Sequence, residues 1–91
     1  MKKKKLTGTQ MLAELCYEPF DAGPLYVAAF KHTNENGDGY KILVDEDGYV
    51  IFGYANGRCP KSYTYSFATK REVQAVAVLL DELEEQGVLK G

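Results

Sequence analysis

Four runs of aromatic and β-branched residues follow one another from Leu25, and they constrain the fold more than any other feature of the sequence. The runs are LYVAAFKH, YKILV, YVIFGY and SYTYSFA, and such residues favour β-strands. Segments rich in Gly, Asn and Asp separate them, namely TNENGDG, DEDG and ANGRCPK. Asn-Gly and Asp-Gly supply the positive φ angles that tight hairpins need. The pattern therefore predicts an antiparallel meander of four strands.

The second turn, DEDG, also predicts the register of the strands. A type I turn with Gly48 in the left-handed position pairs Asp45 with Tyr49. We assign one face of the sheet to the core, and it carries Tyr40, Ile42, Val44, Val50, Phe52 and Tyr54. The other face carries Lys41, Leu43, Tyr49 and Ile51. That set is too apolar for a purely hydrated surface, so either the N-terminal helix covers it, as we expect, or it binds a partner.

A short helix is predicted before the strands, in the segment TGTQMLAELCYEP. Thr7 as N-cap residue and Gln10 three positions later have the spacing of a capping box. Pro19 ends the helix, because the residue before a proline avoids helical geometry. The apolar stripe of this helix consists of Met11, Leu12, Leu15 and Cys16. The segment PFDAGP is then predicted to be a connecting loop.

A longer helix is predicted after the strands, beginning at the capping box that Thr69 and Glu72 form. Gly87 suits the left-handed position of a Schellman ending. The face predicted to pack on the sheet carries Val73, Val76, Ala77, Leu80 and Leu83. Val78 projects from the opposite face, and we interpret it as an isolated surface residue, the alternative being a second contact. The predicted fold is α+β, of order α-β-β-β-β-α, with the longer helix packed on a four-stranded antiparallel sheet.

Length and composition set limits to this fold. Ninety-one residues can build one hydrophobic core, so we predict that 1–91 form a single domain. A hydrophobic content of 45% and a charged content of 26% are ordinary for a globular protein. No run approaches the roughly eighteen apolar residues of a membrane-spanning helix, so no membrane association is predicted.

The charge of the chain is unevenly distributed. The formal net charge is −2, but Lys2–Lys5 hold four of the eleven basic side chains, which leaves seven basic and thirteen acidic side chains in the rest. This acidic body argues against direct binding of nucleic acid. We interpret residues 1–6 as a mobile basic tail, the alternative being contact with phosphates or a membrane surface. No apolar stretch follows the tail as in a signal peptide, and Cys16 and Cys59 form no disulfide framework, so we expect a cytoplasmic protein.

The segment NENGDGYKILVD has the outline of a calcium-binding EF-hand loop, with Asn34, Asn36 and Asp38 at alternate positions. An EF-hand loop needs a helix on each side and a bidentate Glu at its last position. Here both flanking segments are strand-like, and the last position holds Asp45. We therefore predict a hairpin turn and no metal site.

Constellations that would indicate catalysis are weak. His32, the only histidine, could pair with Cys59 as in thiol hydrolases, but no local signature surrounds Cys59, and RCPK is predicted to be a loop. Phosphate-binding glycine loops and zinc-ligand sets are absent from the sequence, so no cofactor is predicted. Further acids lie near the C-terminus and are predicted to be hydrated, namely Asp81, Glu82, Glu84 and Glu85.

These features predict a non-enzymatic module that acts as an inhibitor or regulator by docking on a partner protein with a basic surface. Acidic side chains would orient the encounter, and aromatic side chains would supply contact area. Short, acidic, tyrosine-rich α+β chains of this kind are common among small binding proteins, including inhibitors that phages and mobile elements encode, such as anti-CRISPR proteins. The alternatives are a thiol-dependent enzyme or regulator that uses Cys59, and a single-stranded nucleic-acid binder that uses sheet tyrosines. The predicted partner-binding residues are Asp45, Glu46, Asp47, Tyr49, Leu43, Ile51 and Arg58.

Overall fold

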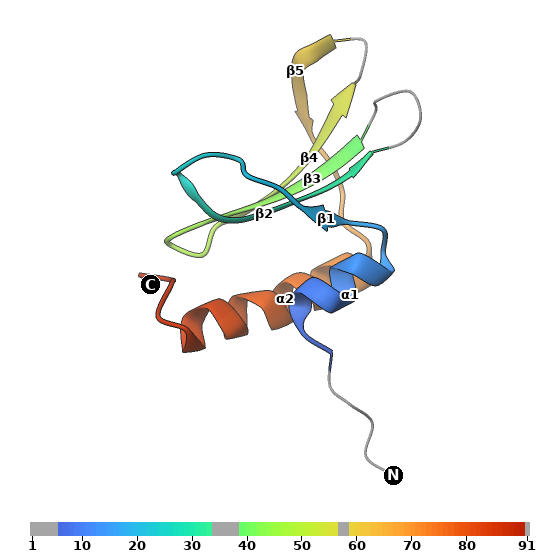
Figure 1. Cartoon of the computed structure of the whole chain (residues 1–91). Coiled ribbons are helices and arrows are strands. Elements are labelled where there is room, and N and C mark those ends of the chain that lie inside the picture. The colour runs from blue at the N-terminus through green and yellow to red at the C-terminus, as the bar shows by residue number, and fades with distance from the viewer. Residues whose placement is uncertain (1–5, 34–38, 57–58, 91) are drawn as a thin grey trace.

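The computed structural model describes residues 6–33, 39–56 and 59–90, with side chains described outside 55–65. Within these residues the fold is a five-stranded antiparallel sheet with two helices on one face (Figure 1). The strands lie in the sheet in the order β1-β2-β3-β4-β5. The elements are, in chain order, α1 Gly8–Glu14, β1 Glu18–Pro19, β2 Tyr26–Thr33, β3 Gly39–Asp45, β4 Val50–Asn56, β5 Cys59–Tyr65 and α2 Lys70–Glu85.

The four predicted strands and both predicted helices are confirmed, and the sheet is the predicted meander. The two-residue strand β1 is an addition, because it pairs with β2 where the predicted helix was to end and the predicted loop to begin. β5 begins at Cys59, so the loop predicted around RCPK is wrong from that residue on. Pro60 is tolerated there because β5 is an edge strand. The side of an edge strand that has no neighbour needs no backbone N–H group for hydrogen bonding. In the described part of the chain, no helix is long and apolar enough to cross a bilayer.

The local signals at the helix ends and in the second turn are confirmed. Both predicted capping boxes are present, with reciprocal hydrogen bonds. In the turn between β3 and β4, Gly48 has a φ of 87°, and Asp45 pairs with Tyr49 as predicted. Gly87 has a φ of 73°, and the two hydrogen bonds of a Schellman ending close the C-terminus of α2.

The core lies between the two helices and one face of the sheet. Its most deeply buried side chains are Leu12 of α1 and the β3 residues Ile42 and Val44. The predicted core face of the β3–β4 hairpin is confirmed for Ile42 and Val44, with Val50 and Phe52 packed against the same cluster. It is wrong for Tyr40, which is 43% exposed. Both helices pack on this face, so the prediction that the N-terminal helix covers the opposite face is wrong (Figure 1).

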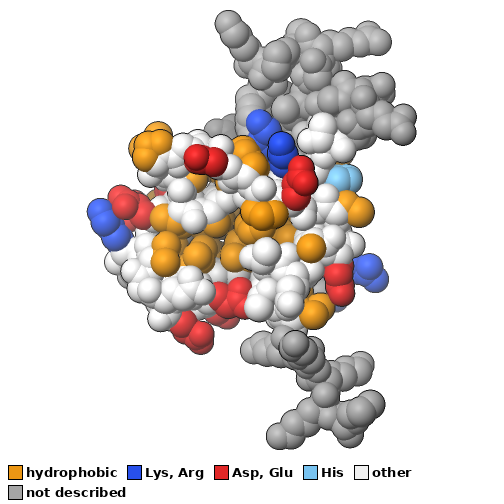
Figure 2. Space-filling view, in the orientation of Figure 1, with side chains coloured by type: hydrophobic (Ala, Val, Ile, Leu, Met, Phe, Trp, Pro, Cys, Tyr) orange, Lys and Arg blue, Asp and Glu red, His pale blue; other side chains and the backbone are white. Residues whose placement is uncertain are grey.

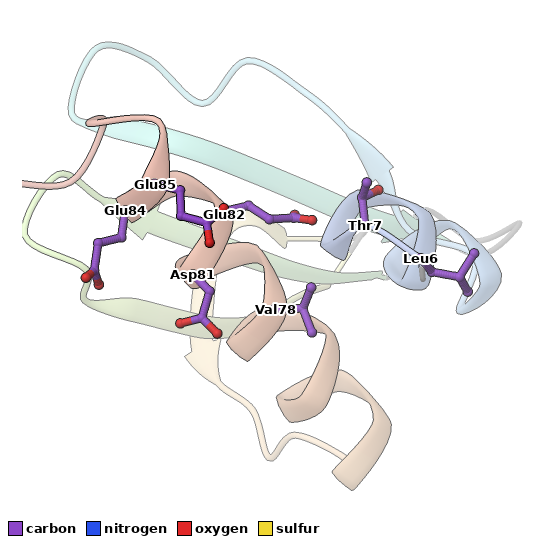
Figure 3. Close-up of a pocket in the computed structure, with 7 residues that line it drawn as sticks. All are labelled: Leu6, Thr7, Val78, Asp81, Glu82, Glu84 and Glu85. Carbon is purple, nitrogen blue, oxygen red and sulfur yellow. The ribbon is translucent and has the colours of Figure 1, made fainter. Parts of the chain in front are cut away.

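A close contact between the helices holds α1 beside α2. A Cβ atom at Gly8 would lie 2.6 Å from the Cα atom of Leu79, so only glycine allows the two backbones to approach this closely. The backbone N–H of Gly8 donates a hydrogen bond to Glu82 Oε1 at 2.9 Å, which satisfies one of the free N–H groups at the start of α1. Figure 3 shows the Glu82 side chain extending from α2 toward Thr7 at the start of α1. Glu82 is half-buried, so the prediction that it is simply hydrated is wrong.

The buried face of α2 is rotated from the predicted one, because α2 is covered by α1 as well as by the sheet. Its buried residues are Ala75, Val76, Leu79 and Leu83. Val73 is 52% exposed and Ala77 is exposed, whereas Leu80 is half-buried at the margin of the core. Val78 is also half-buried and lines a pocket with Leu6 and Thr7 (Figure 3), so its prediction as an open surface position is wrong.

α1 ends earlier than Pro19 predicts. Its C-cap residue is Leu15, and Cys16 adopts the left-handed conformation with a φ of 69° and is exposed. Cys16 therefore lies outside the apolar stripe to which it was assigned. The N–H of Tyr17 donates a hydrogen bond to the carbonyl of Leu12 at 2.9 Å, which closes this turn as in a Schellman ending. The turn directs Tyr17 into the core, where 6% of the residue is exposed.

Leu79→Ala is expected to lower the free energy of unfolding by about 2–5 kcal/mol, the range for truncating a large core side chain. Leu80→Ala is expected to cost less than half as much, because Leu80 is only half-buried and loses less apolar contact area. Urea unfolding followed by circular dichroism measures both losses. Equal losses, or a larger loss at Leu80, would contradict the observed rotation of α2.

Gly8→Ala is expected to destabilise the protein by about 1–3 kcal/mol, as overpacking does, although alanine is the better helix former by about 1 kcal/mol. The added methyl group meets the backbone of Leu79, which cannot move aside as a flexible side chain would. Thr9→Ala, at an exposed position of α1, serves as the control and should change stability little. A melting temperature that rises in Gly8→Ala would show that the helix contact is looser than described.

Candidate functional site

Two of the predicted partner-binding residues lie on the sheet face away from the helices. Only 8% of Leu43 is exposed, and Ile51 is half-buried. Leu43 lies in a row across the sheet between Ala29 and Ile51, and Phe20 extends this row by donating its N–H to the carbonyl of Ala29. Side chains in such a row lie about 5 Å apart on one face and shield each other. Leu43 therefore offers little surface to a partner, and its role in partner binding stays a prediction.

The acids of the β3–β4 turn are used by the fold to different degrees. Asp45 Oδ1 accepts the backbone N–H groups of Asp47 and Tyr49 at 3.0 and 2.9 Å. Glu46 Oε1 lies 3.1 Å from Lys90 Nζ, and the Glu46 carbonyl accepts the Lys90 N–H at 2.7 Å. Asp47 is exposed, as is Tyr49 at 71%. In this turn Asp47 and Tyr49 remain open to a partner, whereas Asp45 and Glu46 are engaged.

The described backbone does not bring Cys59 and His32 together. His32 lies in β2 and Cys59 in β5, with β3 and β4 between them. At about 4.8 Å per strand, the two backbones are about 14 Å apart across the sheet, which speaks against a direct hydrogen bond. The side chain of Cys59 and the whole of Arg58 lie outside the described residues, so their predicted roles stay predictions.

The predicted turn at 34–38 also lies outside the described residues. The strands β2 and β3 flank it, whereas an EF-hand loop requires helices at those positions. Among the residues that the structure describes, no group of three or more His, Cys, Asp or Glu side chains could hold a metal ion.

Aromatic and titratable side chains do meet in a pocket at one end of the helix pair. It lies where the end of α1, the end of β2, the start of β3 and the start of α2 come together, and its volume is about 300 Å³. The lining residues are Leu15, Tyr17, His32, Tyr40, Phe67, Thr69 and Glu72. None of these lining residues is Lys or Arg, so no basic side chain of the described lining opposes the Glu72 carboxylate.

Tyr17 and Glu72 are linked by a hydrogen bond in this pocket. The Tyr17 hydroxyl donates to Glu72 Oε2 at 2.5 Å. The other carboxylate oxygen, Oε1, accepts the backbone N–H of Thr69 at 2.9 Å within the capping box. The carboxylate is thus fixed from two sides, by the N-terminus of α2 and by the segment that follows α1.

These contacts move two pKa values away from neutrality. Burial, followed by the hydrogen bond to Glu72, raises the pKa of Tyr17 well above its usual value of 10.0. Burial opposes the charged form of Glu72, but hydrogen bonds from Tyr17 and Thr69, with attraction to His32, outweigh it and lower the pKa of Glu72. Efficient acid–base catalysts have pKa values near the working pH. The pair is therefore suited to hold a fixed proton donor and a fixed negative charge, and is poorly suited to proton transfer.

Aromatic residues line the same pocket as the carboxylate. The ring centroids of Tyr17 and His32 lie 5.6 Å apart, and Tyr40 packs edge-on against Tyr54 at 5.2 Å. Tyr40 is 43% exposed, and Phe67, in the segment between β5 and α2, is fully exposed. Single exposed apolar residues are normal, but several around one pocket are a feature of binding surfaces.

Sequence reasoning missed this site. The capping-box pattern predicts one partner of Glu72, namely Thr69, because that contact is local. It contains no signal for Tyr17, which is 55 residues away in the chain. Tyr40 was assigned to the core face, and the period-2 pattern has no means of showing that the sheet extends past its helical cover there.

Comparison of the chain with protein families, with curated proteins and with solved structures gives no match. The role of the pocket must therefore be inferred from its geometry and charge. The pocket combines a fixed carboxylate, exposed aromatic side chains and a small volume.

Tyr17→Phe is expected to flatten the loss of stability at alkaline pH. Because the folded state raises the pKa of Tyr17, its contribution is fully present below about pH 10, where unfolded tyrosine ionises, and is lost as the pH rises further. Urea midpoints measured between pH 8.5 and 11.5 should therefore fall more steeply for the wild type than for Tyr17→Phe. Tyr49→Phe, at an exposed position, should keep the wild-type profile. Parallel profiles for the wild type and Tyr17→Phe would contradict the described hydrogen bond.

Proposed function

We propose that this chain is a non-enzymatic protein-binding module that acts as an inhibitor or regulator by docking on a partner protein with a basic surface. The observation that carries the proposal is the full exposure of Phe67 at the rim of a pocket that holds the charged Glu72. Tyr40 and Val73, which follows Glu72 in α2, add further exposed apolar area. An aromatic anchor beside a fixed charge is typical of the residues that dominate protein–protein affinity.

The charge of the molecule supports a basic partner. Apart from Lys2–Lys5, the chain has thirteen acidic and seven basic side chains. Figure 2 shows hydrophobic side chains exposed between the sheet and the helices, with acidic side chains and also basic ones around them. Acidic side chains orient an approaching basic surface and raise the association rate, while the apolar contacts lower the dissociation rate.

The pocket also supports binding over catalysis. A general acid or base must change its protonation state during the reaction, at a pH near its own pKa. The fold instead raises the pKa of Tyr17 and lowers the pKa of Glu72. Both groups therefore keep one protonation state across the neutral range.

Affinity purification from the cells in which the protein acts tests the docking function. The wild type and Leu25→Ser, changed at an exposed residue outside the described pocket lining, should retain a common partner. Phe67→Ser should lose at least about tenfold of that binding, as expected for a hot-spot residue. Binding of the purified partner should weaken as salt is raised, because exposed charges are screened. Equal capture by Phe67→Ser and the wild type, or binding that ignores salt, would contradict the proposal.

A further inference from the structure

We infer that the pocket lined by Tyr17, His32, Tyr40, Phe67 and Glu72 receives an arginine side chain of the partner. The inference rests on the proposed docking function and names the chemical group that the pocket takes. Its volume of about 300 Å³ lies at the lower end of the range for ligand pockets, which suits one side chain better than a cofactor.

The Glu72 carboxylate has the free positions that a guanidinium group requires. A carboxylate offers about four lone-pair positions, two on each oxygen. Oε1 uses one for the N–H of Thr69, and Oε2 uses one for the hydroxyl of Tyr17. One position on each oxygen remains, which matches the two parallel N–H groups of a guanidinium fork.

The electrostatics of the pocket favour a cation over an anion. The N-terminus of α2 carries a partial charge of about +0.5, which opposes a cation. Glu72 carries a full negative charge, and its lowered pKa keeps it ionised at neutral pH. The carboxylate therefore dominates, and among the residues whose side chains the structure describes, no Lys or Arg lines the pocket to cancel its charge. Among the described lining residues, His32 is the other side chain that can carry a charge at neutral pH, and a positive charge on it would repel the guest.

The aromatic lining favours arginine over lysine. Tyr40 and Phe67, whose side chains are exposed, line the same pocket as the carboxylate. A planar guanidinium group stacks on such rings while its edge donates to a carboxylate, whereas an ammonium group is a compact point charge that is more strongly hydrated. The Phe67 side chain is fully exposed and lines the pocket, so it is available to contact the guest.

A titration with a small arginine probe tests the inference without the partner. N-acetyl-arginine amide is added to the ¹⁵N-labelled protein at pH 7.5, and amide shifts are followed by NMR. N-acetyl-citrulline amide, which has nearly the same shape and no charge, is the matched control. The arginine probe should bind with a dissociation constant on the order of 1 mM and shift residues of the pocket, as expected for a ligand of this size. The citrulline probe should bind at least about tenfold more weakly.

Two isosteric variants locate the effect. Glu72→Gln keeps the capping box, because glutamine also serves at that position, but removes the charge. It should weaken the arginine probe about tenfold. Glu84→Gln makes the same change of net charge at an exposed position outside the pocket lining and should leave the affinity unchanged. Phe67→Ala should weaken the probe about threefold, the size of one exposed cation–π contact.

The outcomes separate the inference from the docking function. Equal affinity for the arginine and citrulline probes, or equal losses in Glu72→Gln and Glu84→Gln, would overturn the arginine assignment while leaving capture that depends on Phe67 intact. The docking function would be overturned instead if the arginine probe bound selectively but Phe67→Ser captured every partner that the wild type captures. If Glu72→Gln does not fold, the comparison of the two probes on the wild type still decides the matter.

Discussion

The close approach of the two helices at Gly8 is the contact on which the rest of the structure depends. It holds α1 and α2 on the same face of the sheet, so the opposite face must be closed by its own side chains, among them Phe20 and Leu43. It also covers α2 from the side, which turns the buried arc of that helix toward Leu79. The end of α1 then lies near the start of α2, which allows Tyr17 to reach Glu72.

The pocket shows how a structural contact and a binding site can share one group. The Tyr17–Glu72 hydrogen bond links segments at opposite ends of the chain, so it contributes to the fold. The same bond keeps the carboxylate charged and oriented without using all its lone pairs. A charge that is already positioned loses little conformational entropy when a partner binds, and this preorganisation favours recognition.

The two ends of the molecule differ in how completely their charges are used. At the β3–β4 turn, Asp45 serves the turn and Glu46 pairs with Lys90, so that end is largely satisfied internally. At the other end, Phe67 and Tyr40 are exposed beside a carboxylate that retains free acceptor positions. Acidic residues are therefore a poor guide to the binding surface by themselves, because the fold consumes some of them in turns and caps.

The sequence by itself determined what depends on neighbours along the chain: the four long strands, both capping boxes, the register about Gly48 and the left-handed ending at Gly87. Such features are set by local backbone preferences and by the alternation of apolar residues. Only the tertiary structure decided which way α2 is turned, where α1 lies and that Tyr17 meets Glu72. These three features depend on how elements distant in sequence pack together. A periodic pattern of apolar residues identifies a helix or strand but does not fix its rotation or its position along a neighbouring element. The candidate pocket falls in this second class, because its lining comes from segments between Leu15 and Glu72 that meet only in the folded chain.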